Sequence, residues 1–90
     1  MRLLLFSDEK CGSCRKWLPI IHEIADELNI PLELSDNKEK RQEYGIKGLP
    51  TTILLDDEGN EIYSILGNIR KDKGIESLRY YIDGGKRNRL

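Results

Sequence analysis

The sequence contains no long hydrophobic run and no large excess of charge of one sign. Its apolar stretch near the amino terminus, Leu3 to Phe6, is too short for a membrane-spanning helix or for the apolar region of a signal peptide. The 15 basic and 16 acidic residues leave a formal net charge of −1, so no overall field attracts nucleic acid or an anionic membrane. We therefore expect a cytoplasmic chain that has neither a membrane nor a nucleic acid as a partner.

Cysteine and histidine are also scarce, with two cysteines and one histidine in 90 residues. Cys11 and Cys14 both lie in the segment EKCGSCRKW, and a bridge between them would close too small a loop to stabilise the fold much. A structural zinc site needs about four ligands, but there is no second cysteine pair, and His22 lies two helical turns beyond Cys14. We expect no metal. Two alternatives to redox chemistry remain open: an inert buried pair, and a metal shared by the cysteine pairs of two copies.

The first half of the chain has the pattern of a strand, a helix and a second strand. The apolar run over residues 1–6 predicts a buried strand. Trp17, Ile21 and neighbouring apolar residues recur at helical spacing, which predicts a helix over residues 11–28 with Trp17 in the core. Pro19 interrupts the pattern and should kink this helix. Asn29 is the expected end of this helix, and residues 31–35 predict the second strand. Such a unit normally places its two strands parallel.

The second half predicts a short helix, a hairpin and a final helix. Asp36 followed by Glu39 indicates a helix start, and residues 51–55 and 61–66 flank the turn DDEGN. The order β-α-β-(α)-β-β-α predicts an α/β fold, a four-stranded mixed sheet with helices on both faces. We assign residues 1–85 to one domain and residues 86–90 to a basic, solvated tail.

The CGSC segment lies at the predicted junction of loop and helix, which favours reactive thiols over ordinary core packing. Unpaired backbone N–H groups in the first turn of a helix stabilise an anion, so we expect Cys11 to be the thiolate and the nucleophile. Lys10 and Arg15 add positive charge beside it. Cys14, one turn further along, is expected to donate a hydrogen bond to that thiolate and later to attack a mixed disulfide.

Two separated motifs resemble those of the thioredoxin family: CGSC followed by RKWLP, and YGIKGLPT followed by a hairpin and a glycine. The resemblance covers nearly the whole chain and implies a minimal, glutaredoxin-sized thioredoxin-like fold. It also implies a cis Pro50 that faces the cysteines, a Leu49 backbone that pairs with an extended substrate, and Gly67 on the other side of the groove. The small Gly12 and Ser13 are expected to let a partner polypeptide approach closely.

The chain departs from the family pattern around the cysteines. Lys10 stands where many members have tryptophan, and the second residue between the cysteines is serine in place of proline. Leu5 occupies the position of a buried aspartate that is thought to help move the proton of the inner cysteine. We therefore expect Cys14 to lose its proton to water, to an exposed carboxylate such as Asp8 or Glu9, or to the leaving thiolate.

We predict a dithiol–disulfide oxidoreductase that reduces protein disulfides through a redox-active Cys11–Cys14 pair, without a cofactor. A thioredoxin reductase or glutathione is the expected electron donor, and a monomer is the expected state. The stretches GLP and GNIRK do not match the glutathione-binding stretches of glutaredoxins, but Lys47 and Arg70 could attract a carboxylate. A glutathione-linked reductant is therefore one alternative, and a non-catalytic redox adaptor or binding module of the same fold is another.

Overall fold

The computed structural model describes residues 1–84, which form four strands and three helices. In chain order these are β1 (Arg2–Phe6), α1 (Gly12–Leu28), β2 (Leu32–Ser35), α2 (Lys38–Glu43), β3 (Thr51–Leu55), β4 (Glu61–Leu66) and α3 (Lys71–Ile82). The predicted order β-α-β-(α)-β-β-α is confirmed. The predicted basic tail, residues 86–90, lies outside the described residues.

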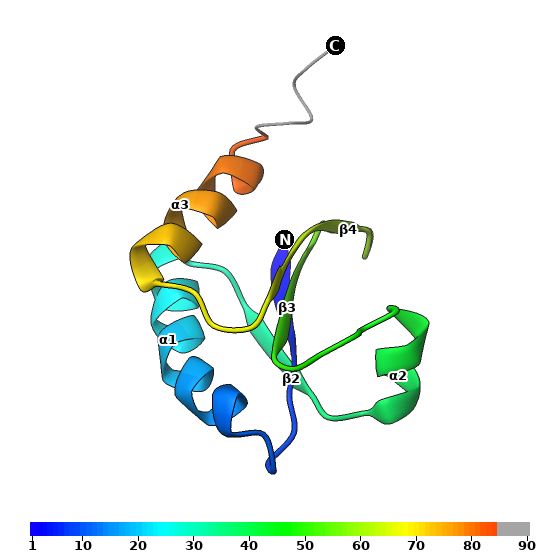
Figure 1. Cartoon of the computed structure of the whole chain (residues 1–90). Helices are drawn as coiled ribbons and strands as arrows, with labels where there is room; N and C mark the ends of the chain where they lie inside the picture. Colours follow the sequence, from blue (N-terminus) through cyan, green and yellow to red (C-terminus); the bar gives the residue numbers. More distant parts are fainter. Residues whose placement is uncertain (85–90) are drawn as a thin grey trace.

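The four strands form one mixed sheet in the order β2-β1-β3-β4. β1 and β2 are parallel, whereas β3 is antiparallel to both β1 and β4. α1 and α3 lie on one side of the sheet and α2 on the other (Figure 1), so the predicted fold class is confirmed. The carboxyl ends of β1, β2 and β4 and the amino end of β3 meet at one edge, where Ser35, Phe6, Thr51 and Leu66 form a row.

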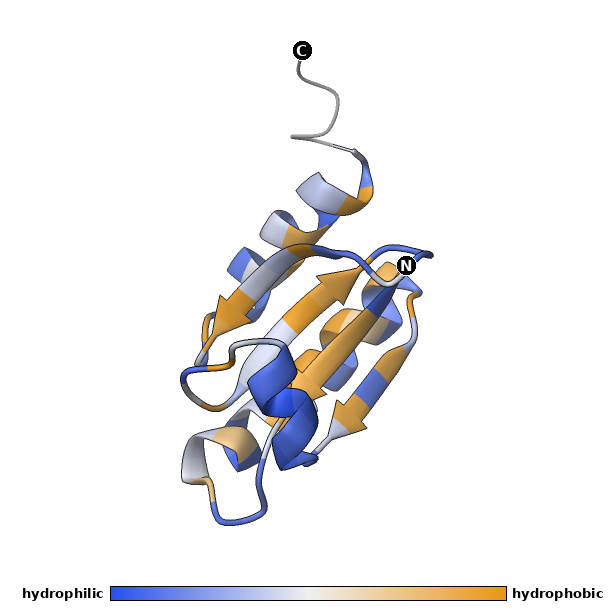
Figure 2. Ribbon diagram, turned by 90° about the vertical axis from the view of Figure 1, so that its right-hand side faces the viewer, coloured by the Kyte–Doolittle hydropathy of each residue, from blue (hydrophilic) through white to orange (hydrophobic). Residues whose placement is uncertain are grey.

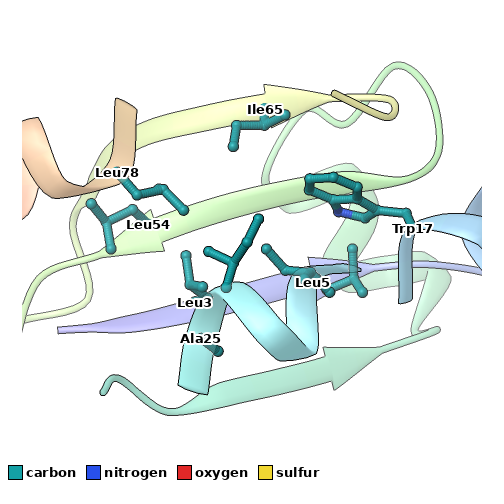
Figure 3. Packing of buried hydrophobic residues seen from close by; sticks show 9 residues of the cluster. Leu3, Leu5, Trp17, Ala25, Leu54, Ile65 and Leu78 are labelled. Atoms are coloured by element: carbon teal, nitrogen blue, oxygen red, sulfur yellow. The ribbon is translucent and has the colours of Figure 1, made fainter. Parts of the chain in front are cut away.

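The two central strands, β1 and β3, are buried almost throughout and are strongly hydrophobic (Figure 2). Their alternate residues point to opposite faces and build two apolar clusters. The cluster facing α1 and α3 comprises Leu3, Leu5, Trp17, Ile21, Ile24, Ala25, Leu54, Ile65 and Leu78 (Figure 3). The cluster on the other face, toward α2, comprises Leu4, Phe6, Ile53 and Leu55. Because each large buried side chain contributes about 1.5–3 kcal/mol, the first cluster holds α1 and α3 on the sheet. The second cluster is covered by Tyr44, Ile46 and Leu49, which follow α2.

The long helix α1 runs from Gly12 to Leu28 as one element that includes Pro19, and the kink expected at Pro19 stays a prediction. Proline removes one backbone hydrogen bond from a helix, but the buried side chains of Trp17 and Ile21 on either side hold the helix on the sheet. The predicted end at Asn29 is confirmed. Its backbone is left-handed (φ 57°, ψ 46°), and its N–H donates to carbonyls of the last helical turn.

The short helix α2 begins one residue later than the sequence pattern indicates. The side-chain oxygen of Asn37 accepts hydrogen bonds from the backbone N–H groups of Glu39 at 2.9 Å and Lys40 at 3.0 Å. The prediction that Asp36 starts this helix is therefore wrong. Asparagine and aspartate stabilise a helix equally well as the N-cap residue. Because Asp36 follows directly after the end of β2, the N-cap is the next residue, Asn37.

Candidate active site

Cys11 caps the amino terminus of α1, one residue before the first helical residue. Its backbone is extended (φ −92°, ψ 112°), and its Sγ accepts a hydrogen bond from the backbone N–H of Cys14 at 3.2 Å. Its own N–H donates to the carbonyl of Asp8 at 3.0 Å, which fixes the loop before the helix. Cys11 is half-buried, whereas Gly12 and Ser13 are exposed. The sulfur thus lies at the positive end of the helix dipole and within hydrogen-bonding distance of a backbone N–H.

Cys14 is buried, with 4% of its surface exposed. Burial raises the pKa of its thiol, and the hydrogen bond with the Cys11 side chain and the charges of Cys11 and Asp8 raise it further. A hydrogen bond from the Asp8 backbone acts in the opposite direction and lowers the pKa. The net effect is a thiol that holds its proton more strongly than an ordinary cysteine does.

The predicted groove residues lie together at the same edge of the sheet. The Leu49–Pro50 peptide bond is cis, and Pro50 is buried. The carbonyl of Pro50 accepts a hydrogen bond from the Gly67 N–H at 2.8 Å. Gly67 has a φ of +82°, which side chains rarely adopt, so glycine suits this turn. Leu49, Pro50 and Gly67 therefore form one connected rim, at the edge where β1 leads into the loop that carries Cys11.

Trp17 connects the cysteine helix to the strand that follows this rim. Its indole Nε1–H donates to Thr52 Oγ1 at 2.8 Å, and both side chains are buried. Figure 3 shows the Trp17 ring lying against the sheet. Thr52 lies two residues after Pro50 and pairs with Leu5 on β1. Thr52 is not among the residues that the sequence predicted for the site. The available signal is the pair of hydroxyls at the start of the apolar strand TTILL, because a buried hydroxyl needs a partner.

The two charged residues predicted to tune Cys11 are exposed, and their bonds are to the preceding loop. The backbone N–H of Lys10 donates to Asp8 Oδ1 at 2.9 Å. The guanidinium of Arg15 donates to the carbonyl of Glu9 at 3.3 Å. These bonds order the loop around the cysteines, and the electrostatic role of Lys10 and Arg15 stays a prediction.

A pocket of about 510 Å³ opens beside Cys14. Its walls come from the loop between β1 and α1, from the first turns of α1, and from the end of β2. Asp8, Glu9, Asp36 and Arg15 supply its charged lining. The buried thiol therefore borders a partly acidic space that is large enough for several water molecules.

A dipeptide that occurs twice in the sequence accounts for two of the acidic residues of this pocket. The dipeptide Ser-Asp occurs at residues 7–8, after β1, and again at residues 35–36, at the end of β2. The N–H of Ser7 donates to the carbonyl of Ser35 at 3.0 Å. Because neighbouring parallel strands end at the same edge of a sheet, the repeated dipeptide brings Asp8 and Asp36 to one pocket.

The described residues provide no metal site that includes the cysteines or His22. His22 is exposed on α1, and both cysteines are free thiols. Within residues 1–84, no group of three or more histidine, cysteine, aspartate or glutamate side chains is arranged to hold a metal ion. In the same part of the chain, no helix combines the length and the apolar character needed to cross a membrane.

Comparisons with known proteins agree with this geometry. A family model described as a thioredoxin-like domain matches residues 2–82. A thioredoxin from Pyropia yezoensis is 30% identical over 77 residues, covering 80% of this chain and 71% of the relative. One from Chlamydia pneumoniae is 35% identical over 75 residues, with coverages of 79% and 71%. The solved structure of thioredoxin 1 from Thermosipho africanus TCF52B has a TM-score of 0.79 at 28% identity, covering 92% of this chain and 96% of that one. The chain therefore belongs to the thioredoxin-like family, and thiol–disulfide oxidoreduction is the activity that this membership indicates.

Proposed function

We propose that this chain reduces protein disulfides, with Cys11 as the nucleophile and Cys14 as the resolving cysteine. The observation that carries the proposal is the contrast between the two sulfurs. Cys11 is partly exposed at the helix amino terminus and accepts an N–H hydrogen bond, whereas Cys14 is buried and its pKa is raised. The first environment favours attack on an incoming disulfide, and the second keeps a thiol protonated until a mixed disulfide has formed.

The proposed reaction has two displacement steps. The Cys11 thiolate attacks one sulfur of the substrate disulfide, and the other substrate sulfur leaves as a thiolate. Cys14 then loses its proton and attacks Cys11 Sγ, which forms the Cys11–Cys14 disulfide and releases the second substrate thiolate. Two electrons have passed to the substrate, and a thioredoxin reductase or glutathione returns two electrons to the protein. The scheme itself needs no metal or organic cofactor.

The rim beside the cysteines supports an extended polypeptide as the substrate. None of the backbone hydrogen bonds found outside helices and strands in residues 1–84 involves the N–H or the carbonyl of Leu49. These groups are therefore available to pair with a substrate backbone as a short added strand. Nothing fills the space beside Gly12 within 4 Å of where a Cβ would lie, so a substrate backbone has room to approach Cys11.

We place glutathione second among the possible substrates. Lys47 and Arg70 are the two cations that could attract a carboxylate of glutathione. Arg70 is already bonded to Asp72, at 2.8 and 3.2 Å. Lys47 is exposed, and no ion pair to it is found among the described residues. One exposed lysine offers a weak, solvent-screened contact to a tripeptide carboxylate.

Reduction of insulin disulfides by a catalytic amount of protein tests the proposal, with NADPH and a thioredoxin reductase as the electron source. We expect turnover by the wild type and none by Cys11→Ser. Cys14→Ser should accumulate a mixed disulfide with insulin, because its nucleophile is intact and its resolving thiol is absent. Ser13→Ala is the matched control and should retain activity. Absence of turnover together with absence of the trapped species would identify a binding module instead of a reductant.

A further inference from the structure

Cys14 must lose its proton before it attacks Cys11, and the layer beneath α1 offers no carboxylate to accept it. Leu5 is fully buried there and packs in the cluster that contains Trp17. Thr52, the polar neighbour of Leu5, has its oxygen bonded to the Trp17 indole. In the described part of the chain, a proton acceptor for Cys14 is therefore expected on another side of the sulfur.

The pocket beside Cys14 supplies such a group in Asp8. Asp8 and Cys14 line the same pocket, and the backbone of Asp8 lowers the pKa of the Cys14 thiol. The negative charge of the Asp8 carboxylate also acts on that thiol. The carboxylate is held in position because its Oδ1 accepts the N–H of Lys10 at 2.9 Å. Its side chain is 34% exposed, so it reaches water as well as the pocket.

Arg41 of α2 completes the environment of this carboxylate. Its Nη2 lies 3.9 Å from Asp8 Oδ2. Its buried Nε and Nη2 atoms have no hydrogen-bond partner among the described residues. The guanidinium therefore holds one side of the Asp8 carboxylate and leaves the side that borders the pocket open.

The other charged groups of the pocket are less well placed to accept the proton. Glu9 and Asp36 line the same pocket, but both are exposed and neither is among the groups that shift the pKa of the Cys14 thiol. Arg15 is a cation and is bonded to the Glu9 carbonyl. The groups that do act on Cys14 are Cys11, its reaction partner, and Asp8.

We propose that Asp8 accepts the proton of Cys14 during resolution, directly or through a water molecule in the pocket, in place of an acceptor at position 5. The inference rests on the proposed function. Once Cys11 carries the substrate sulfur, the Cys14 S–H proton passes to the Asp8 carboxylate and the Cys14 electron pair attacks Cys11 Sγ. The Cys11–substrate bond breaks, and the substrate sulfur leaves as a thiolate. Asp8 then returns the proton to solvent across its exposed side.

A single-turnover reaction with dithiobis(nitrobenzoate), a disulfide that releases a coloured thiolate, separates the two steps. At one equivalent of reagent, the first release reports attack by Cys11 and its rate depends on reagent concentration. The second release reports resolution by Cys14 and its rate is independent of concentration. Asp8→Asn keeps an oxygen to accept the Lys10 N–H, so the loop should fold, and an unchanged first phase checks this. Asp36→Asn is the matched control, because it removes the same charge from the same pocket.

We expect Asp8→Asn to slow the second phase about tenfold near neutral pH, below the usual contribution of a well-matched base because carboxylates are weak bases toward thiols. Asp36→Asn should leave both phases nearly unchanged, and Asp8→Glu should recover part of the rate. In Asp8→Asn the second phase should become steeper with pH, since hydroxide replaces the carboxylate as acceptor.

Two results would overturn the proposal. If Asp8 were only a neighbouring negative charge, its removal would favour the Cys14 thiolate and make the second phase faster. An equal slowing in Asp8→Asn and Asp36→Asn would indicate a general field effect of the pocket. Loss of both phases in the wild type would instead refute the proposed function, so the two failures are distinguishable.

Discussion

The hydrogen bond between Trp17 and Thr52 should contribute measurably to stability, and Thr52→Val tests this contribution. The bond is 2.8 Å long, Trp17 is 0% exposed and Thr52 is 1% exposed. Valine has nearly the shape of threonine but cannot accept a hydrogen bond, so the indole N–H would remain buried without a partner. An unsatisfied buried donor costs about 1–3 kcal/mol. We expect Thr52→Val to lower the free energy of unfolding by about 1–2 kcal/mol, since the new methyl group offsets part of the loss.

Measuring Thr52→Val in the Trp17→Phe background separates the hydrogen bond from the other effects of the substitution. Phenylalanine has no donor, so the Thr52 hydroxyl is already without this partner before the second change is made. Thr52→Val should then be neutral or stabilising, which reverses its sign relative to the Trp17 background. The coupling energy of the double-mutant cycle should be about 1–3 kcal/mol.

Urea unfolding of the four reduced proteins gives the four free energies. Far-ultraviolet circular dichroism is the suitable probe, because Trp17 is the sole tryptophan of the chain. Equal m-values across the set would show that the variants differ in stability alone. A coupling energy below about 0.5 kcal/mol would refute the view that this bond joins the cysteine helix to β3.

Three further predictions concern a cap, a helix contact and pH. Asn37→Ala should destabilise the protein by about 1 kcal/mol through loss of the α2 cap, whereas Asp36→Ala should have little effect, and equal losses in urea unfolding would contradict the assigned cap. Gly74→Ala places a Cβ 2.9 Å from Ile24 Cδ1, a side-chain end that must shift, but it also gains about 1 kcal/mol of helix propensity, so we expect a net loss of no more than about 1 kcal/mol. The double variant Gly74→Ala/Ile24→Val removes the clashing methyl group and should recover much of that loss. Thermal unfolding of both variants measures the recovery, and no gain in the double variant would contradict the assigned clash. Because the pKa of Cys14 is raised in the folded state, the reduced protein should lose stability as pH rises above about 9, where the unfolded chain begins to release this proton first. Urea unfolding at a series of pH values from neutral to alkaline measures this dependence of the free energy of unfolding on pH. Cys14→Ser should abolish the part that comes from Cys14, and an identical pH dependence in the variant would contradict the prediction.

The elements that could be predicted depend on short-range patterns. The apolar run at residues 3–6, the helical spacing of Trp17 and Ile21, and the turn DDEGN each act within a few residues, so the order of strands and helices followed from them. The start of α2 did not follow from local sequence, because Asp36 and Asn37 are equivalent as N-cap residues. The position at which β2 ends decides which of the two caps the helix. The helix continues through Pro19, because the packing of buried residues on both sides of the proline outweighs one lost hydrogen bond.

By itself, the sequence predicted the residues that we propose carry the chemistry: the two thiols in CGSC and the GLPT segment. The motif spacing also indicated the family, which the comparisons show. Only the tertiary structure decided that Cys14 is buried, that Trp17 bonds Thr52, and that Asp8 shares a pocket with Cys14. The physical reason is separation along the chain. The Trp17–Thr52 bond spans 35 positions, and the pocket joins the ends of two strands. Such contacts arise from packing of the whole sheet, which local periodicity does not encode.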